Sequence, residues 1–144
     1  MPRLDAERIA LWRQFCTVST ALQRRVDLTL VDEHDLPLAW FEVLAAVRDA
    51  GGSMRVHELC EALDEVPSSL SRRLGRMEDD DLLQRVYSPQ PDDRRAVTVS
   101  LTPEGRSLWR DANITFRRIV QEHFAKRLTD TDIGALQRVF GKLS

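Results

Sequence analysis

Two short amphipathic segments on either side of a tight turn constrain the fold of this chain most. Apolar side chains recur at steps of three and four over residues 56–63 and again over 67–79, as in helices with one buried face. Residues 64–66 separate the segments, and Pro67 stands at the first position of the second one, where helices tolerate proline well. Two short helices joined by so short a turn predict a helix-turn-helix.

The next segment changes from helical to strand periodicity. Residues 83–87 and 97–101 alternate apolar and polar side chains, and the turn-rich segment 89–95 lies between them. A period of two predicts strands, so we expect a β-hairpin, or wing, over 83–101. The helix-turn-helix and the hairpin together predict a compact central unit over 37–102.

The N-terminal third predicts a helix that is longer than a small domain needs. One amphipathic pattern runs from Leu4 to Leu30, about 28 residues and about 40 Å of helix. Pro37 then marks a break, and a short second helix ends at the pair Gly51 and Gly52. A long pattern without internal caps often packs against a second chain, so we assign residues 1–36 to dimerisation.

The C-terminal segment predicts two further amphipathic helices. Thr102 and Pro103 are suited to the N-cap and first position of one helix, and Thr129 with Asp132 resembles a capping box that opens the other. Apolar residues step by three and four to the C-terminus. We expect residues 103–144 to complete the dimerisation region.

The composition is that of one globular domain. The 144 residues are 42% apolar and 31% charged, with a formal net charge of −2. No run approaches the roughly 18 apolar residues of a membrane span, and residues 1–10 carry charges where a signal peptide would be apolar. Two cysteines are too few for a disulfide scaffold. We therefore predict a cytoplasmic protein with no membrane partner.

The placement of charge on segment 67–79 predicts contact with DNA. The isoelectric point near 5.9 argues mildly against such a partner, but arginines and short hydroxyls lie opposite the apolar face of this helix and suit the major groove. The alternative is a solvated surface helix, yet the acids of the segment begin only at Glu78. The candidate DNA-contacting residues are Ser68, Ser69, Ser71, Arg72, Arg73 and Arg76.

A second basic cluster lies at the tip of the predicted hairpin. Arg94 and Arg95 stand there beside Asp92 and Asp93. Paired arginines on a hairpin tip can enter the minor groove, whose negative potential attracts guanidinium groups. Charged turns are common, so this signal alone is weak.

The order of elements and several motifs make the whole chain resemble the MarR (multiple antibiotic resistance regulator) family of winged helix-turn-helix transcription factors. The motifs are LAWFEVLAAV, VHELCEALDEVPSSLSRRLGRME, LLQRVYS, DDRRAVTVSLTPEGR and LTDTDIGALQRVFGKL. The most specific is the wing segment, in which Asp93, Arg94 and Arg95 run into LTPEGR and fit the D-x-R and L-T-x-x-G-R pattern of the family.

The resemblance implies a mainly α fold with a small β-hairpin wing, about six helices, and an obligate homodimer formed by the N- and C-terminal helices. It also implies that 67–79 is the recognition helix and that a wing arginine enters the minor groove. Because a wing aspartate of the family often braces nearby arginines, we expect a structural role for Asp93, with Arg85 as its partner.

Two positions depart from the family pattern. Asp81 stands where the family usually has a glycine after the recognition helix, so we expect a left-handed residue there and a cost of about 1 kcal/mol. His57 stands where the family usually has a serine or threonine cap before the helix-turn-helix, so that helix start is expected to be bonded differently.

Other chemistries have weaker support. Cys16 invites a redox role, but its nearest basic neighbour is Arg13 and a structural role is favoured; Cys60 is expected to pack in the core. His57-x-x-Cys60 is the one close pair of metal ligands, and a third ligand is missing from its surroundings in the sequence. We find no phosphate loop or nucleophile elbow, and we predict no enzyme activity, metal or cofactor.

We predict a homodimeric, sequence-specific DNA-binding regulator, most simply a repressor on a pseudo-palindromic operator of double-stranded DNA. The family resemblance adds release by a small aromatic or phenolic effector. Trp12, Phe15, His34 and Trp40 are the candidate ligand-binding residues, with dimer or lobe core as an equally weighted alternative. The rival functions are a winged-helix module used only for protein association, and an enzyme.

Overall fold

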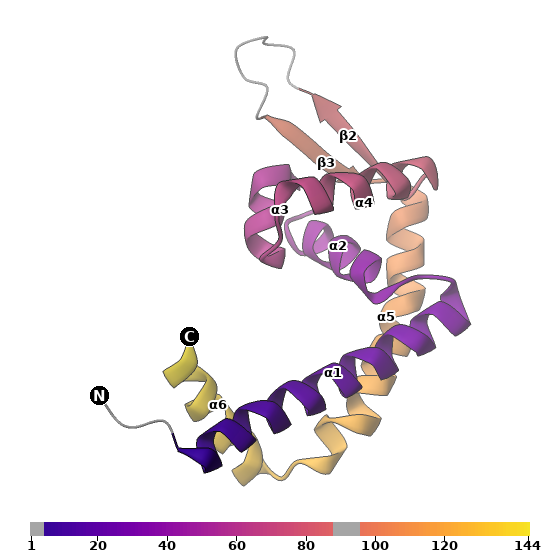
Figure 1. Cartoon of the computed structure of the whole chain (residues 1–144). Coiled ribbons are helices and arrows are strands. Elements are labelled where there is room, and N and C mark those ends of the chain that lie inside the picture. The colour runs from indigo at the N-terminus through magenta and orange to yellow at the C-terminus, as the bar shows by residue number, and fades with distance from the viewer. Residues whose placement is uncertain (1–4, 88–95) are drawn as a thin grey trace.

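The computed structural model describes residues 5–87 and 96–144, which form a mainly helical fold with a small sheet. Figure 1 shows a lobe of short helices and strands above two long crossing helices. In chain order the elements are α1 (Ala6–His34), α2 (Leu38–Asp49), β1 (Ser53–Arg55), α3 (Val56–Leu63), α4 (Pro67–Asp79), β2 (Leu83–Tyr87), β3 (Val97–Leu101), α5 (Pro103–His123), a 3-10 turn (Ala125–Arg127) and α6 (Asp130–Leu143). The fold class predicted from the sequence is confirmed.

The lobe contains one strand more than the predicted hairpin. β1 pairs antiparallel with β3, so that the strand order is β1-β3-β2. Sequence reasoning missed β1 because three residues are too few to display a period. Leu83 and Val99 of the sheet are fully buried together with Leu44, Leu59 and Leu74 from the helices. This common core fixes the position of α4 against the sheet.

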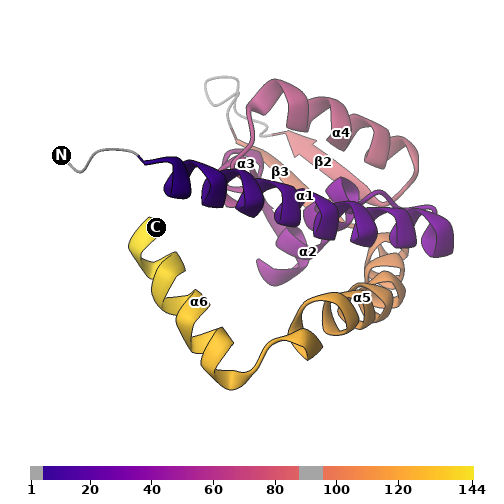
Figure 2. The ribbon, with the colours of Figure 1, turned by 60° about the horizontal axis from the view of Figure 1, so that its bottom comes forward.

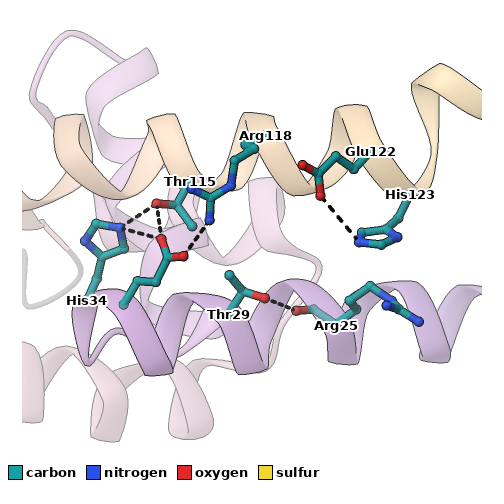
Figure 3. Close-up of polar contacts among 8 residues, drawn as sticks. Arg25, Thr29, His34, Thr115, Arg118, Glu122 and His123 are labelled. Atoms are coloured by element: carbon teal, nitrogen blue, oxygen red, sulfur yellow. Dashed lines mark hydrogen bonds and ion pairs between the residues drawn. The ribbon is translucent and has the colours of Figure 1, made fainter.

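Helices α1 and α5 are joined by a polar network near the C-terminal end of α1 (Figure 3). The Thr115 hydroxyl donates to Glu33 Oε2 at 2.9 Å, and Arg118 forms an ion pair with the same carboxylate. His34 Nε2 lies 2.7 Å from the Thr115 oxygen. Because the single hydroxyl proton goes to Glu33, the His34 ring nitrogen must be the donor. Glu33 therefore links the long helix to α5 through neutral and charged donors.

Helix α6 leads away from α5, and its apolar side chains remain open. Figures 1 and 2 both show α6 reaching back toward the N-terminal end of α1. None of the α6 side chains is buried. The large apolar side chains exposed on α1 and α6 include Leu11, Trp12, Phe15, Val18, Ile133, Phe140 and Leu143.

Helix ends follow the sequence except at His57. Thr102 caps α5 by accepting from the Gly105 N–H, and Thr129 forms a capping box with Asp132. Asp81 has φ of 61°, as expected for a left-handed residue. The His57 cap is wrong, because α3 begins at Val56, so that His57 already lies inside its first turn. Continuation of β1 into α3 places the helix start there.

Candidate nucleic-acid interface

The apolar face of α4 fixes which of its polar side chains point outward. Leu70, Leu74 and Met77 are fully buried against the lobe. On the other side, Ser68, Ser71, Arg72 and Arg76 are exposed, and Ser69 is half-buried. The structure thus gathers these sequence-predicted residues on the outer face of α4, except Arg73, which belongs to a flank of the helix.

One flank of α4 is tied to the turn that precedes it. Arg73 Nη1 lies 2.8 Å from Glu65 Oε2, and its Nη2 donates to Glu65 Oε1 at 2.9 Å. The side chain of Arg73 is only 16% exposed. A two-point contact of this kind between a guanidinium and a carboxylate has a fixed geometry. Arg73 therefore holds the helix-turn-helix together.

The other flank of α4 is tied to the first wing strand. The Glu78 carboxylate accepts the Arg85 backbone N–H at 2.7 Å and lies 3.4 Å from Arg85 Nη2. Arg85 Nη1 is 3.5 Å from both the carbonyl and the hydroxyl oxygen of Ser71. Gly75 lies between these contacts, and a Cβ there would be 3.5 Å from Nη2. Arg85 thus follows the side of α4 and fixes β2 against it.

The two ties leave Arg72 and Arg76 as the uncommitted cations of α4. Within the described residues neither side chain forms an ion pair or a side-chain hydrogen bond, whereas Arg73 and Arg85 do. A guanidinium without a protein carboxylate partner is available to phosphate or to a guanine edge. Glu65 and Glu78 neutralise the arginines on the two flanks of α4. The outer face of the helix therefore stays positive.

The wing is described only at its base. β2 and β3 are paired from Leu83 with Leu101 to Tyr87 with Val97. The predicted minor-groove residues Arg94 and Arg95, and the predicted brace Asp93, lie outside the described residues. The partner of Arg85 in the described part is Glu78, which sequence reasoning did not identify. A pairing seven residues apart, from the end of α4 to β2, has no helical spacing to reveal it.

Trp40 lies beside α4, away from the other aromatic residues expected at an effector site. A hollow with a volume of about 300 Å³ is lined by Trp40, Ser69, Arg72, Arg73 and Arg76. Trp12 and Phe15 are exposed neighbours with ring centroids 6.3 Å apart. Trp12 lies about 33 Å and Phe15 about 28 Å along α1 from His34, given a rise of about 1.5 Å per residue. One chain therefore does not bring the four predicted ligand-binding residues together.

A larger groove separates the long helices from the lobe. It has a volume of about 930 Å³ and is walled by α1, α2, the end of α3 and α5. None of the four predicted ligand-binding residues lines this groove. Phe116, Ile119 and Val120 give it an apolar wall, and burial beside it raises the pKa of the Glu42 carboxyl. The periodicity of α1 and α5 indicated helices but not which of their faces form a cavity.

The cysteines and histidines do not build a second site in the described part of the chain. Burial, reinforced by the charge of Glu65, raises the pKa of the Cys60 thiol, which opposes nucleophilic reactivity. Cys16 is a partly exposed free thiol. Among residues 5–87 and 96–144, no cluster of three or more ligand side chains could hold a metal ion. None of the described helices is long and apolar enough to cross a membrane.

Comparison with known proteins gives a consistent family signal. A family model described as the MarR family matches residues 34–96. Multiple antibiotic resistance protein MarR of Salmonella typhimurium is 28% identical over 109 residues, which cover 76% of this chain and 74% of that protein. HTH-type transcriptional repressor MdtR of Bacillus subtilis is 26% identical over 117 residues, 81% of this chain and 73% of that protein.

A solved structure extends the likeness to almost the full length. The structure of a variant of MarR from E. coli, complexed with operator DNA, superposes with a TM-score of 0.82 at 27% identity. The match covers 99% of each chain. The long end helices therefore belong to the shared fold as much as the lobe does.

Proposed function

Because the chain belongs to the MarR family of winged-helix proteins, we propose that it is a DNA-binding transcriptional regulator that reads the major groove with α4. The observation that carries the proposal is the pair of uncommitted arginines, Arg72 and Arg76, on an outer face whose two flanks are braced. A rigid helix with free guanidinium groups and short N-terminal hydroxyls suits base edges and phosphates. Arg94 and Arg95 are proposed to add minor-groove contacts from the wing.

The protein is proposed to act as a homodimer. Residues 37–102 would contact DNA, while 1–36 and 103–144 would pair two copies through the apolar faces of α1 and α6. Those faces are too apolar for isolated surface helices, with Trp12 65% and Leu143 73% exposed. Two-fold symmetry then sets recognition helices about 34 Å apart, which matches half-sites about one helical turn apart on a pseudo-palindrome. A cytoplasmic repressor that blocks transcription from such a site is the simplest role.

Release by a small molecule is proposed to use the groove between the long helices and the lobe. A ligand there would contact α1 and α5 on one side and α2 and α3 on the other. It would change DNA affinity only if it bound one spacing of the two lobes better than the other. An aromatic or phenolic ligand fits the apolar wall that includes Phe116, and no catalytic activity forms part of the proposal.

Selection of bound sequences from a random DNA pool tests the proposal. We expect a pseudo-palindromic sequence, bound more weakly as salt rises because phosphate contacts release counterions. Arg72→Ala or Arg76→Ala should relax the base preference at one position of each half-site by about 1–3 kcal/mol. Arg117→Ala removes an exposed arginine of α5 and serves as the matched control. A protein that enriches no sequence and shows no salt-dependent affinity would instead be a protein-association module.

A further inference from the structure

We propose that Trp40 is a DNA backbone contact, with its indole N–H donating to a phosphate next to the bases that α4 reads. This inference rests on the proposed DNA binding and extends the interface from the helix-turn-helix to the start of α2. It reassigns a residue whose sequence context suggested an effector pocket. A DNA backbone phosphate and a free phosphate ion offer the same oxygen acceptors. We assign the contact to the DNA strand.

The position of Trp40 is set by two different surroundings. It is the third residue of α2, and one part of its ring packs against the buried core of the lobe. Another part lines the hollow beside α4, across from Ser69, Arg72 and Arg76. A large ring held by the core loses little side-chain entropy on binding. Trp40 is therefore a rigid wall of a site otherwise made of long, movable arginines.

The hollow is built for an anion. Its lining has three guanidinium groups and one hydroxyl, and no acidic side chain. The charge of Arg73 is balanced by Glu65, but Arg72 and Arg76 have no carboxylate partner among the described residues. A negative group placed here would gain from both unpaired guanidinium groups.

The indole N–H of Trp40 has no hydrogen-bond partner within the described residues. An indole can only donate, so an anionic oxygen is its natural complement. The hollow is continuous with the face that carries Arg72 and Arg76, which we assign to DNA. A strand whose bases meet those arginines would carry its phosphates along the edge of the helix, toward α2. The geometry thus favours a backbone phosphate over a base edge.

Trp40→Phe is the sharpest test, because it keeps the ring and removes only the donor. On the duplex selected from the random pool, we expect about ten-fold weaker binding, the usual size of a charge-assisted hydrogen bond. The loss should be equal on a mismatched duplex, because a phosphate carries no sequence. The slope of affinity against salt should stay unchanged, because the indole carries no charge and its loss changes no counterion release. Trp109→Phe, which removes an indole N–H of α5 that likewise has no hydrogen-bond partner in the described residues, is the matched control.

Single methylphosphonate linkages locate the contact. At one linkage of each half-site, the methylphosphonate should weaken DNA binding by the unmodified protein several-fold more than it weakens binding by Trp40→Phe. The two losses are then less than additive in a double-mutant cycle, because both remove the same contact. Fully additive losses at every linkage, or a Trp40→Phe affinity equal to that of the unmodified protein, would overturn the inference. Thermal melting identifies a variant that is merely unfolded. In that case the effect of DNA on the tryptophan emission of the unmodified protein decides.

Tryptophan fluorescence of the unmodified protein supplies a readout that needs no loss of function. DNA should change the emission of the unmodified protein and of Trp109→Phe, and not that of Trp40→Phe. Emission unaffected by a duplex that is bound would overturn the inference while leaving the proposed function intact. If inorganic phosphate alone gives the full change, the hollow is a free-anion site and the assignment to DNA is wrong. A protein that binds no duplex at all refutes the proposed function and the contact together.

Discussion

Helices α4 and α6 are both amphipathic, yet one chain completes only the first. The three large apolar side chains on the inner face of α4 are fully buried, and ion pairs tie both of its flanks to neighbouring elements. None of the α6 side chains is buried, and Phe140 and Leu143 remain 44% and 73% exposed. The difference teaches that the lobe takes its structure from a single chain, whereas the end helices offer surface that only a further partner can cover.

The largest expected effect separates the two helices by matched truncations. Leu74→Ala removes a fully buried side chain from α4 and should destabilise the protein by about 2–5 kcal/mol, from lost transfer free energy and the cavity left behind. This loss of stability should be the same at every protein concentration when it is measured from the unfolding of the lobe. Phe140→Ala should cost little in the isolated chain, but should lower the melting temperature of a paired protein most at low concentration. Urea unfolding measures the loss for Leu74→Ala and thermal melting measures that for Phe140→Ala, each at several protein concentrations.

A concentration-independent loss for Phe140→Ala would contradict the proposed pairing. Light scattering provides the direct control. The unmodified protein should be a dimer, and Phe140→Ala should dissociate at a higher protein concentration than the unmodified protein. An unmodified protein that stays monomeric would mean that the apolar face of α6 is covered in some other way.

Sequence periodicity predicted the helices of both regions equally well, but it could not tell their fates apart. The helix over 67–79 and the capping box at Thr129 have the bounds and contacts that their residue patterns indicated. Burial is a property of the surroundings, so the same spacing of apolar residues describes α4 against a core and α6 without one. The three residues of β1 carried no period at all, and only pairing with β3 defines them.

The sequence predicted which residues make up the candidate site, but not which of them hold the fold together and which are free to contact DNA. The arginines of α4 were visible as a group, while the structure divides them into Arg73, which is bound to Glu65, and the uncommitted Arg72 and Arg76. Glu65 lies in a turn eight residues before Arg73, outside any helical repeat, so the pairing depends on how the chain turns. The place of Trp40 beside α4 likewise depends on packing between elements far apart in sequence.

A smaller effect is expected where the lobe itself is strained. Asp81 has φ of 61°, a left-handed conformation that follows α4 and costs a residue with a Cβ about 1 kcal/mol. Asp81→Gly should therefore raise the stability of the lobe by up to about 1 kcal/mol, less what glycine loses by its greater freedom when unfolded. Thermal melting measures the change, with Asp111→Gly, at an exposed position inside α5, as a control that should destabilise. A change for Asp81→Gly as unfavourable as that of the control, which bears the glycine cost without a left-handed residue, would show that the turn stores no strain.

The smallest effect concerns the junction between the two regions, where Glu33 of α1 meets α5. The Thr115 hydroxyl, together with Arg118, holds the pKa of the Glu33 carboxyl below its usual value of 4.5. A folded-state pKa lowered in this way adds stability that is present above the unfolded value and is lost as pH falls through the folded one. Glu33→Gln should thus melt at a lower temperature than the unmodified protein at pH 7, and the difference should shrink as the pH falls below 4.5. Asp111→Asn, at an exposed acid of α5 without an ion pair in the described chain, controls for net charge. A difference in melting temperature for Glu33→Gln that persists unchanged into acid would mean that shape, not charge, holds α1 on α5.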